Sequence, residues 1–243
     1  MQLPSSEDYV FFHPPENWSC LVDFRLIYNG PLRADSCATD KHTIRKVFHE
    51  QLVQLWEKHP MLSQQMTVPV VCYATPKNLV SYPGPGVPQV CASDHEDAMS
   101  YVQHLANNYR RGNYRFVPLV QTNQAVCALD ILFLRHEAPG HLVKSYGGDI
   151  DARIATLFDG LKMPASDSEL GKFKNPDADE NPFFCLLEDD RSITELHITT
   201  DRLLLPVGGG HEINNVFLVI HVKTLSINPE GLFADVHMLG LGL

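Results

Sequence analysis

The chain has 243 residues, of which 44% are hydrophobic and 20% charged, a composition typical of a folded protein with one large or two small domains. Its longest apolar runs, such as Val216–Ile220, are strand-sized and fall far short of the roughly 18 residues of a membrane helix. No basic region followed by an apolar core opens the chain, and the six cysteines form no Cys-x-x-Cys pair. We therefore expect a cytoplasmic protein with reduced thiols and no membrane partner.

The net charge of −10 at first argues against a nucleic-acid partner, but the charge is unevenly distributed. Residues 149–201 hold 13 acids and 5 bases, whereas residues 1–148 hold 13 acids and 12 bases. An acidic block is usually a solvated or disordered face, but several of these carboxylates adjoin strand-like or helical residues. Crowded carboxylates on ordered structure repel one another unless a cation joins them, so the block predicts a metal.

The first half of the chain predicts an irregular leader followed by alternating strands and helices. The leader covers residues 1–18. Apolar periodicity and capping signals predict a strand over 20–28, a helix over 41–58, a strand over 68–73 and a helix from 93 to about 111. The last of these begins at a capping box, Ser93-Asp-His-Glu96, and Gly112 is a plausible stop.

The second half predicts further strands around one amphipathic helix. The expected strands are 125–134, 183–187, 192–199 and 216–223, and the helix is 150–161, stopped before Pro164. Residues 165–182 are polar and predict a loop. The pattern as a whole indicates a single α/β or α+β domain over residues 19–243, with a mixed β-sheet and a few packed helices.

Two acidic clusters carry the chemical signal. Asp149 precedes the helix over 150–161 and Asp151 lies in its first turn, where the helix dipole favours negative charge. Capping alone explains one of these acids, but two exceed what a cap needs. Asp159 lies on the same helix face as Asp151, and Glu188-Asp189-Asp190 directly follows the strand over 183–187. An ordinary acidic turn is the alternative interpretation of this second cluster.

Together the clusters suggest a site for a hard cation. Mg²⁺ prefers a few carboxylate oxygens and keeps several waters, which leaves coordination positions for a phosphate. Such a site can activate water and stabilise the charge that develops on a phosphodiester.

The same residues resemble a known family. Asp149-Ile-Asp-Ala-Arg-Ile-Ala-Thr-Leu-Phe-Asp-Gly-Leu161, followed by Glu188-Asp-Asp-Arg-Ser-Ile193, resembles RusA-type Holliday-junction resolvases, the crossover junction endodeoxyribonucleases. That family's pattern is approximately D-x-D-N-R-x-K-x-x-x-D-x-L, then a loop and D-D-x-x-I. The resemblance is specific over about 149–205, within a motif-bearing core of about 120–225, and is weak over 1–110.

The resemblance implies a RusA-like mixed α/β fold, a homodimer, and cleavage of branched DNA in recombination and repair that depends on Mg²⁺ or Mn²⁺. It implies metal-binding and catalytic roles for Asp149, Asp151 and Asp190, and supporting roles for Asp159 and Asp189.

Two positions depart from the family's pattern. Ala152 stands where the family has Asn, and Ala155 stands at the family's catalytic Lys position. A lysine one turn after Asp151 would meet phosphate or stabilise the leaving oxygen, which alanine cannot do. Lys162 and Arg153 are nearby cations, but neither occupies the missing position. Two hypotheses stay open: an endonuclease, impaired or not, and a catalytically inactive nucleic-acid-binding or interaction protein that keeps the fold.

Two basic stretches are the expected phosphate contacts if the chain binds DNA. Lys41, Arg45 and Lys46 gather on the first predicted helix, and Arg110, Arg111 and Arg115 alternate with aromatic residues. This composition suits phosphate contact and base stacking. A solvated helix face or helix end is the alternative for each stretch.

Overall fold

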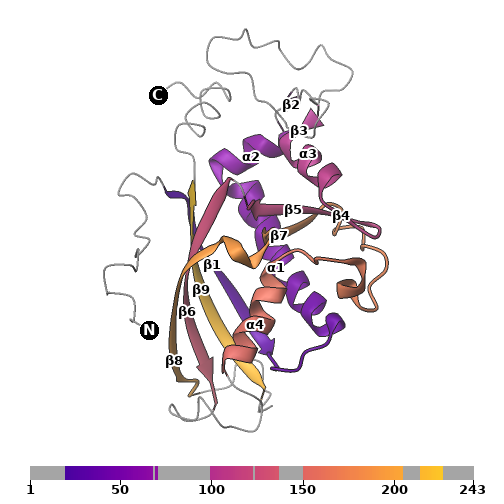
Figure 1. The fold of residues 1–243 in the computed structure, drawn as a ribbon. Helices are drawn as coiled ribbons and strands as arrows, with labels where there is room; N and C mark the ends of the chain where they lie inside the picture. Colours follow the sequence, from indigo (N-terminus) through magenta and orange to yellow (C-terminus); the bar gives the residue numbers. More distant parts are fainter. Residues whose placement is uncertain are drawn as a thin grey trace, which may run out of the picture.

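The computed structural model describes residues 20–67, 69–70, 99–122, 124–136, 150–204 and 214–226, and in these residues two sheets enclose a long helix (Figure 1). The larger of these sheets has the strand order β1-β9-β6-β8 and the smaller has the order β4-β5-β7, while β2 and β3 form a separate antiparallel pair. The strands are β1 (Cys20–Pro31), β2 (Pro69–Val70), β3 (Met99–Ser100), β4 (Arg110–Arg111), β5 (Tyr114–Val120), β6 (Ala125–Arg135), β7 (Phe183–Leu187), β8 (Ile193–Arg202) and β9 (Asn215–Ser226).

The helices lie on one side of the larger sheet (Figure 1). They are α1 (Ala38–Lys58), α2 (Pro60–Thr67), α3 (Tyr101–Asn108) and α4 (Ile150–Leu161), with the short 3₁₀ helices η2 (Asp167–Leu170) and η3 (Asp190–Ser192). None of the helices in the described part of the chain combines the length and apolar character that crossing a membrane requires. The predicted mixture of helices and mixed sheets is confirmed.

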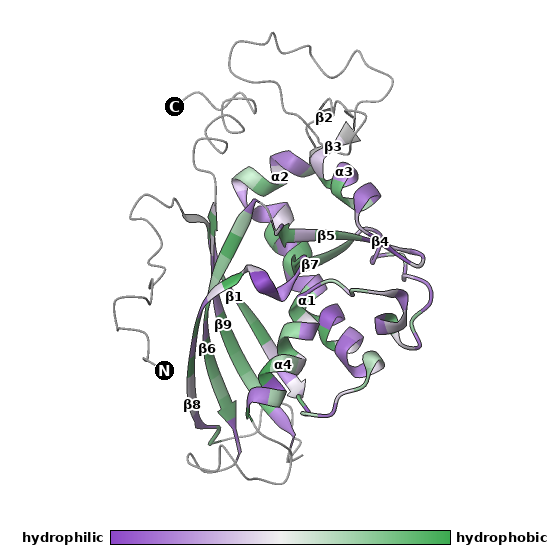
Figure 2. Ribbon diagram, viewed as in Figure 1, coloured by the Kyte–Doolittle hydropathy of each residue, from purple (hydrophilic) through white to green (hydrophobic). Residues whose placement is uncertain are grey.

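Alternating side chains make the larger sheet two-faced. In β9 the residues from Val216 to Ser226 alternate between buried and partly exposed positions, and β6 alternates in the same way over most of its length. β6 runs antiparallel to β9 and parallel to the edge strand β8. Figure 2 shows β6 and β9 as mostly hydrophobic and β8 as mostly hydrophilic. The buried face of this sheet packs against α1 and α4 and forms the main core.

Helix α1 lies between the two sheets, and its buried residues form one broad face of the helix. Ile44, Phe48, Leu52 and Trp56 belong to the main core, as their helical spacing predicts. The same helix also buries polar side chains, because it has sheet residues on more than one side. His49 is satisfied there: the Phe184 amide donates to its Nδ1 at 2.9 Å, and its Nε2 lies 3.1 Å from the Asp179 carbonyl.

Several expected elements differ in the structure. Helix α3 begins at Tyr101 and not at 93, and its capping box is Ser100 with Gln103. Gly112 does not stop a helix but, with Asn113, forms the turn that joins β4 to β5, with a positive φ of 55°. The strand β5 was not predicted, because Pro118 interrupts its apolar run. The leader over 1–18, the Ser93 capping box and most of the strand predicted over 68–73 lie outside the described residues.

Helix α4 packs closely on α1 at a glycine. A Cβ added at Gly160 would overlap Cγ2 of Ile44 and lie 3.0 Å from its Cβ. Alanine is the better helix former by about 1 kcal/mol, so propensity alone would favour Gly160→Ala.

We expect Gly160→Ala to destabilise the fold by about 1–3 kcal/mol, because the overpacking outweighs the propensity gain. Urea denaturation measures this change. The double variant Gly160→Ala with Ile44→Ala tests the cause: the two losses should sum to more than the loss of the double variant. Additive losses would show that the contact between the two residues is not responsible.

His42 is a buried histidine without a polar partner. It is fully buried, and neither ring nitrogen has a hydrogen bond to the part of the chain that the structure describes. The rings of Tyr114, Phe173 and Phe183 surround it at centroid distances of 5.2, 4.9 and 5.4 Å. Burial, with the nearby charges of Arg45 and Lys46, lowers its pKa from 6.5 to about 3.

This burial predicts a specific acid sensitivity. Below pH 6.5 the unfolded chain gains a proton on His42 that the folded chain does not take up until about pH 3, so stability falls as pH decreases through this window. The limiting slope is about 1.4 kcal/mol per pH unit for one proton. His42→Phe should remove this contribution, measured by urea denaturation between pH 8 and pH 4.5. At pH 8 His42 is neutral in the folded and the unfolded chain, so the difference in stability between the variant and the wild type at this pH measures the change in packing alone. An unchanged slope in the variant would contradict the assignment to His42.

Candidate active site

Helix α4 presents its acidic residues on the face opposite its core. Ile154, Leu157 and Leu161 are buried, whereas Asp151 and Ala155 are exposed and Asp159 is partly buried. Asp151 lies in the first turn, as predicted. Asp149 lies outside the described residues.

The three acids that follow β7 have three different partners. Glu188 accepts hydrogen bonds from the Thr122 amide at 2.9 Å and the Tyr109 hydroxyl at 3.1 Å, which ties β7 to the end of β5. Asp189 caps η3: the Arg191 amide donates to it at 3.0 Å, and the Arg191 guanidinium pairs with it at 2.8 Å. Both of these carboxylates therefore have local structural roles.

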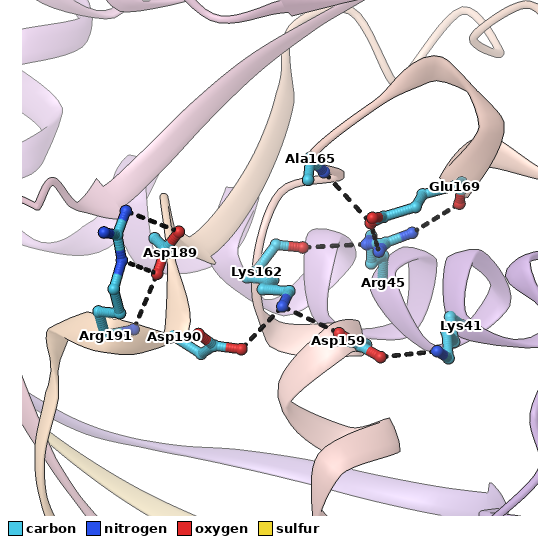
Figure 3. A network of polar contacts seen from close by, with 9 residues as sticks. All are labelled: Lys41, Arg45, Asp159, Lys162, Ala165, Glu169, Asp189, Asp190 and Arg191. Carbon is cyan, nitrogen blue, oxygen red and sulfur yellow. Dashed lines mark hydrogen bonds and ion pairs between the residues drawn. The ribbon is translucent and has the colours of Figure 1, made fainter.

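Asp190 faces helix α4 and meets a lysine. The Lys162 ammonium lies 2.7 Å from Oδ2 of Asp190 and 3.0 Å from Oδ1 of Asp159 (Figure 3). The second oxygen of Asp159 lies 2.7 Å from Nζ of Lys41. The order Asp190, Lys162, Asp159, Lys41 thus alternates in charge. We call Asp159 and Asp190, with Lys162 between them, the lysine-bridged acid pair.

Electrostatics keep Asp159 and Lys162 ionised. Burial alone raises the pKa of Asp159, but hydrogen bonds from Lys41 and Lys162 outweigh burial and hold its pKa below the usual value. For Lys162, burial lowers the pKa, but hydrogen bonds to Asp190 and Asp159 reverse the effect and raise it. Both shifts favour the charged forms, so the lysine is a resident cation between two carboxylates.

Asp151 lies away from this group. It precedes Asp159 by eight residues, which corresponds to about 12 Å along the helix axis. Asp190 is tied to Lys162, one residue beyond the C-terminal end of α4, whereas Asp151 lies at the N-terminal end. The structure therefore brings Asp190 together with Asp159, and it places Asp151 about two helical turns away.

The fit of these residues to a metal is partial. Carboxylate oxygens of Asp159 and Asp190 converge on one point, as oxygen ligands of a hard cation do, but the ammonium of Lys162 holds that point. Within the part of the chain that the structure describes, no three His, Cys, Asp or Glu side chains form a group suited to a metal ion. A set that includes Asp149 falls outside that part.

The prediction that Arg45 of the first helix contacts DNA is wrong. Its side chain is fully buried, its Nε donates to the Lys162 carbonyl at 2.9 Å, and Nη1 donates to the Glu169 carbonyl at 3.1 Å. Burial removes this guanidinium from the surface where a phosphate contact was expected. Lys46 is also engaged, at 2.8 Å from Asp177 and 2.6 Å from Glu180.

The arginines of the β4–β5 hairpin lie at the surface with partial structural engagement. Arg110 is exposed and bonds to Asn107 at 3.1 Å. Arg111 donates to the Pro164 carbonyl at 2.9 Å, and Arg115 donates to the Asn181 side chain at 2.9 Å. Arg110 pairs with Arg115 across the hairpin, which keeps these two cations together. These residues remain the candidate phosphate contacts.

Sequence reasoning named Lys162 only as a nearby cation and missed its role as the bridge. The signal was present: Asp159 and Lys162 are three residues apart, a spacing at which helix side chains meet. Comparison with protein-family models, with curated proteins and with solved structures finds no match to this chain.

The bridge predicts an effect of Lys162→Met on stability. Without the ammonium, Asp190 loses its lysine and faces Asp159, which keeps only Lys41, and we expect a loss of about 1–3 kcal/mol, between the values for exposed and buried pairs. Millimolar Mg²⁺ should restore part of the loss in the variant but not stabilise the wild type to the same degree. Urea denaturation with and without Mg²⁺ measures both effects.

The matched control is Lys174→Met, which removes the same charge from an exposed loop position. It should change stability by less than about 0.5 kcal/mol, with or without Mg²⁺. Equal behaviour of the two variants would show that the bridge contributes nothing specific.

Proposed function

We propose that this chain is a RusA-like, structure-selective DNA endonuclease that acts on branched DNA such as Holliday junctions, as a homodimer and with Mg²⁺ or Mn²⁺. The observation that carries the proposal is the convergence of Asp159 and Asp190 on a single cation, the ammonium of Lys162. These two acids belong to the two motif segments of the RusA-like pattern, and both contact Lys162 although they lie 31 positions apart in the sequence.

The proposed division of roles combines the RusA-like pattern, which assigns the metal ligands, with the placement of the other side chains. By the resemblance, Asp149, Asp151 and Asp190 would hold the metal, which when bound supplies an activated water and charge stabilisation at a phosphodiester. This would require Asp190 to leave Lys162 and approach the N-terminal end of α4, about two helical turns away. Asp159 supports the site by holding Lys162 and Lys41, and Asp189 supports it by fixing η3, on which Asp190 lies. The residues that would contact DNA phosphates are Arg110, Arg111 and Arg115. Lys41 would contact a phosphate beside Asp159, with which it forms an ion pair.

A second candidate is a catalytically inactive nucleic-acid-binding or interaction protein that retains a RusA-like fold. One observation favours it specifically: Asp190 already has a cation, Lys162, at 2.7 Å. Ala155 is exposed on α4 and carries no group that could meet a phosphate, and the net charge of −10 opposes DNA binding.

Nicking of a synthetic four-way junction in Mg²⁺ or Mn²⁺ distinguishes the two candidates. We expect the double variant Ala152→Asn with Ala155→Lys to cleave about 10²–10³-fold faster than the wild type, because a cation that stabilises only the transition state changes rate more than affinity. Junction affinity, measured by fluorescence anisotropy, should change by much less.

Two controls accompany this experiment. Asp151→Asn in the double variant should abolish cleavage, and a linear duplex of the same length should be cut far more slowly than the junction. Binding of the junction without cleavage by either protein would favour the inactive candidate. Equal cleavage by the wild type and the double variant would show that positions 152 and 155 take no part in the chemistry.

A further inference from the structure

The two edges of the larger sheet differ in how far the described residues occupy them. At the β1 edge the side-chain amide of Gln51 binds the backbone: its Oε1 accepts from the Ile27 amide at 2.8 Å, and its Nε2 donates to the Ile27 carbonyl at 2.7 Å. The opposite edge is β8, which pairs with β6 on one side and has no strand of the described residues on the other (Figure 1). An unpaired edge presents backbone donors and acceptors to any extended chain that can pair with it.

The pairing with β6 determines which backbone groups of β8 face outward. Directly after β8, the Leu203 amide donates to the Arg135 carbonyl of β6 at 2.7 Å, so the odd-numbered residues of β8, in step with Leu203, direct their backbone groups toward β6. The N–H and C=O of one residue point to the same side of a strand, and successive residues alternate. The outward backbone groups are therefore those of the even-numbered residues, among them Leu196, Ile198 and Thr200.

Apolar side chains extend the core face of the sheet as far as this edge. Leu196 and Ile198 of β8 are opposite Leu129 and Ile131 of β6, both of which are buried in the main core. Leu196 is nevertheless 43% exposed, because no strand of the described residues lies beyond it. A further strand with apolar side chains at these positions would remove that surface from water.

The opposite face of β8 is acidic. Glu195 and Asp201 are exposed on this face, and Asp130 of β6 is exposed beside them, opposite His197. The Asp201 carboxylate also accepts from the Arg202 amide at 2.7 Å, so the open row of backbone groups ends before Arg202. A strand added at this edge would meet two exposed carboxylates on this face, which basic side chains complement.

We propose that the open edge of β8 binds, by strand addition, an extended segment of a partner protein in which basic and apolar residues alternate. The basic side chains would face Glu195 and Asp201, and the apolar side chains would cover Leu196 and Ile198. A second copy of β8 is less suited to this edge, because it brings the same two acids. In the antiparallel register centred on Ile198 it would set Glu195 against Asp201 of the other copy.

Fluorescence anisotropy with the full chain tests the proposal. The probe is a fluorescein-labelled nine-residue peptide with blocked ends that alternates valine and lysine. It should bind, and the same peptide with glutamate in place of lysine should bind at least about tenfold more weakly, because it sets like charges against β8. Two further peptides, methylated at the valine or at the lysine amide nitrogens, separate strand addition from general charge attraction. One of them should lose binding and the other should keep it, because alternate amides of a strand face opposite sides.

Variants of β8 locate the binding site. Thr200→Pro removes an outward amide and no hydrogen bond to β6, so the strand keeps its place and the affinity for the valine–lysine peptide should fall at least about tenfold. The matched control is Thr200→Ala, which keeps the amide and should bind like the wild type. Glu195→Gln with Asp201→Asn should weaken binding about three- to tenfold, because it removes both acidic partners of the lysines. Urea denaturation checks that each variant is folded.

Three results would overturn the proposal. The first is a wild type that does not bind the valine–lysine peptide. The second is equal binding by the folded Thr200→Pro and Thr200→Ala variants, or an unchanged affinity of the double amide variant, either of which would place the peptide elsewhere. The third is an equal effect of the two methylation patterns. The assay contains neither metal nor DNA, so its outcome is independent of the proposed nuclease activity.

Discussion

The arrangement of the candidate site depends on one buried arginine. Arg45 lies in the middle of α1, and its guanidinium holds the carbonyls of Lys162 and Glu169, which follow α4. An ion pair to Glu169 at 3.5 Å completes the contact, and the Glu169 carboxylate in turn accepts from the Ala165 amide at 3.2 Å. Because a charged group without partners is costly to bury, these acceptors must stay in place when the chain folds. The end of α4 and the start of the loop after it are therefore fixed against α1.

The consequence for Lys162 is that its backbone and its side chain face different partners. Its carbonyl is bound by Arg45, while its ammonium reaches Asp159 and Asp190. The acidic excess of residues 149–201 is compensated in part by lysines from α1: Lys41 pairs with Asp159, and Lys46 pairs with Asp177 and Glu180. Repulsion among these carboxylates was the reason to predict a metal. Lysines from a segment more than 100 residues away reduce that repulsion instead.

The residues that sequence reasoning placed correctly are those whose position depends on local pattern. Ile44, Phe48 and Leu52 in α1, and Ile154, Leu157 and Leu161 in α4, recur at helical spacing and are all buried. The errors arose where tertiary contacts overrule local signals. β5 tolerates Pro118 because β4 pairs only with Tyr114 and Arg115, so that at Pro118 the strand has β7 on one side and no strand of the described residues on the other. Arg45 has the local appearance of a surface cation although its partners lie more than 100 residues further along the chain. Asp190 was expected near Asp151, but only the packing of β7 against α4 determines which end of that helix it meets.

The pairing of Asp190 with Lys162 has a physical implication for both proposed functions. A cation that bound Asp190 would have to displace the Lys162 ammonium, which two carboxylates stabilise at once. Displacement would leave that ammonium beside the site, where an anion such as a phosphate is its natural replacement partner. A cation and a phosphate that arrive together would satisfy Asp190 and Lys162 at the same time, whereas a cation alone would leave Lys162 with Asp159 and without a replacement for Asp190. The lysine-bridged acid pair therefore favours joint binding of metal and phosphate over binding of the metal alone.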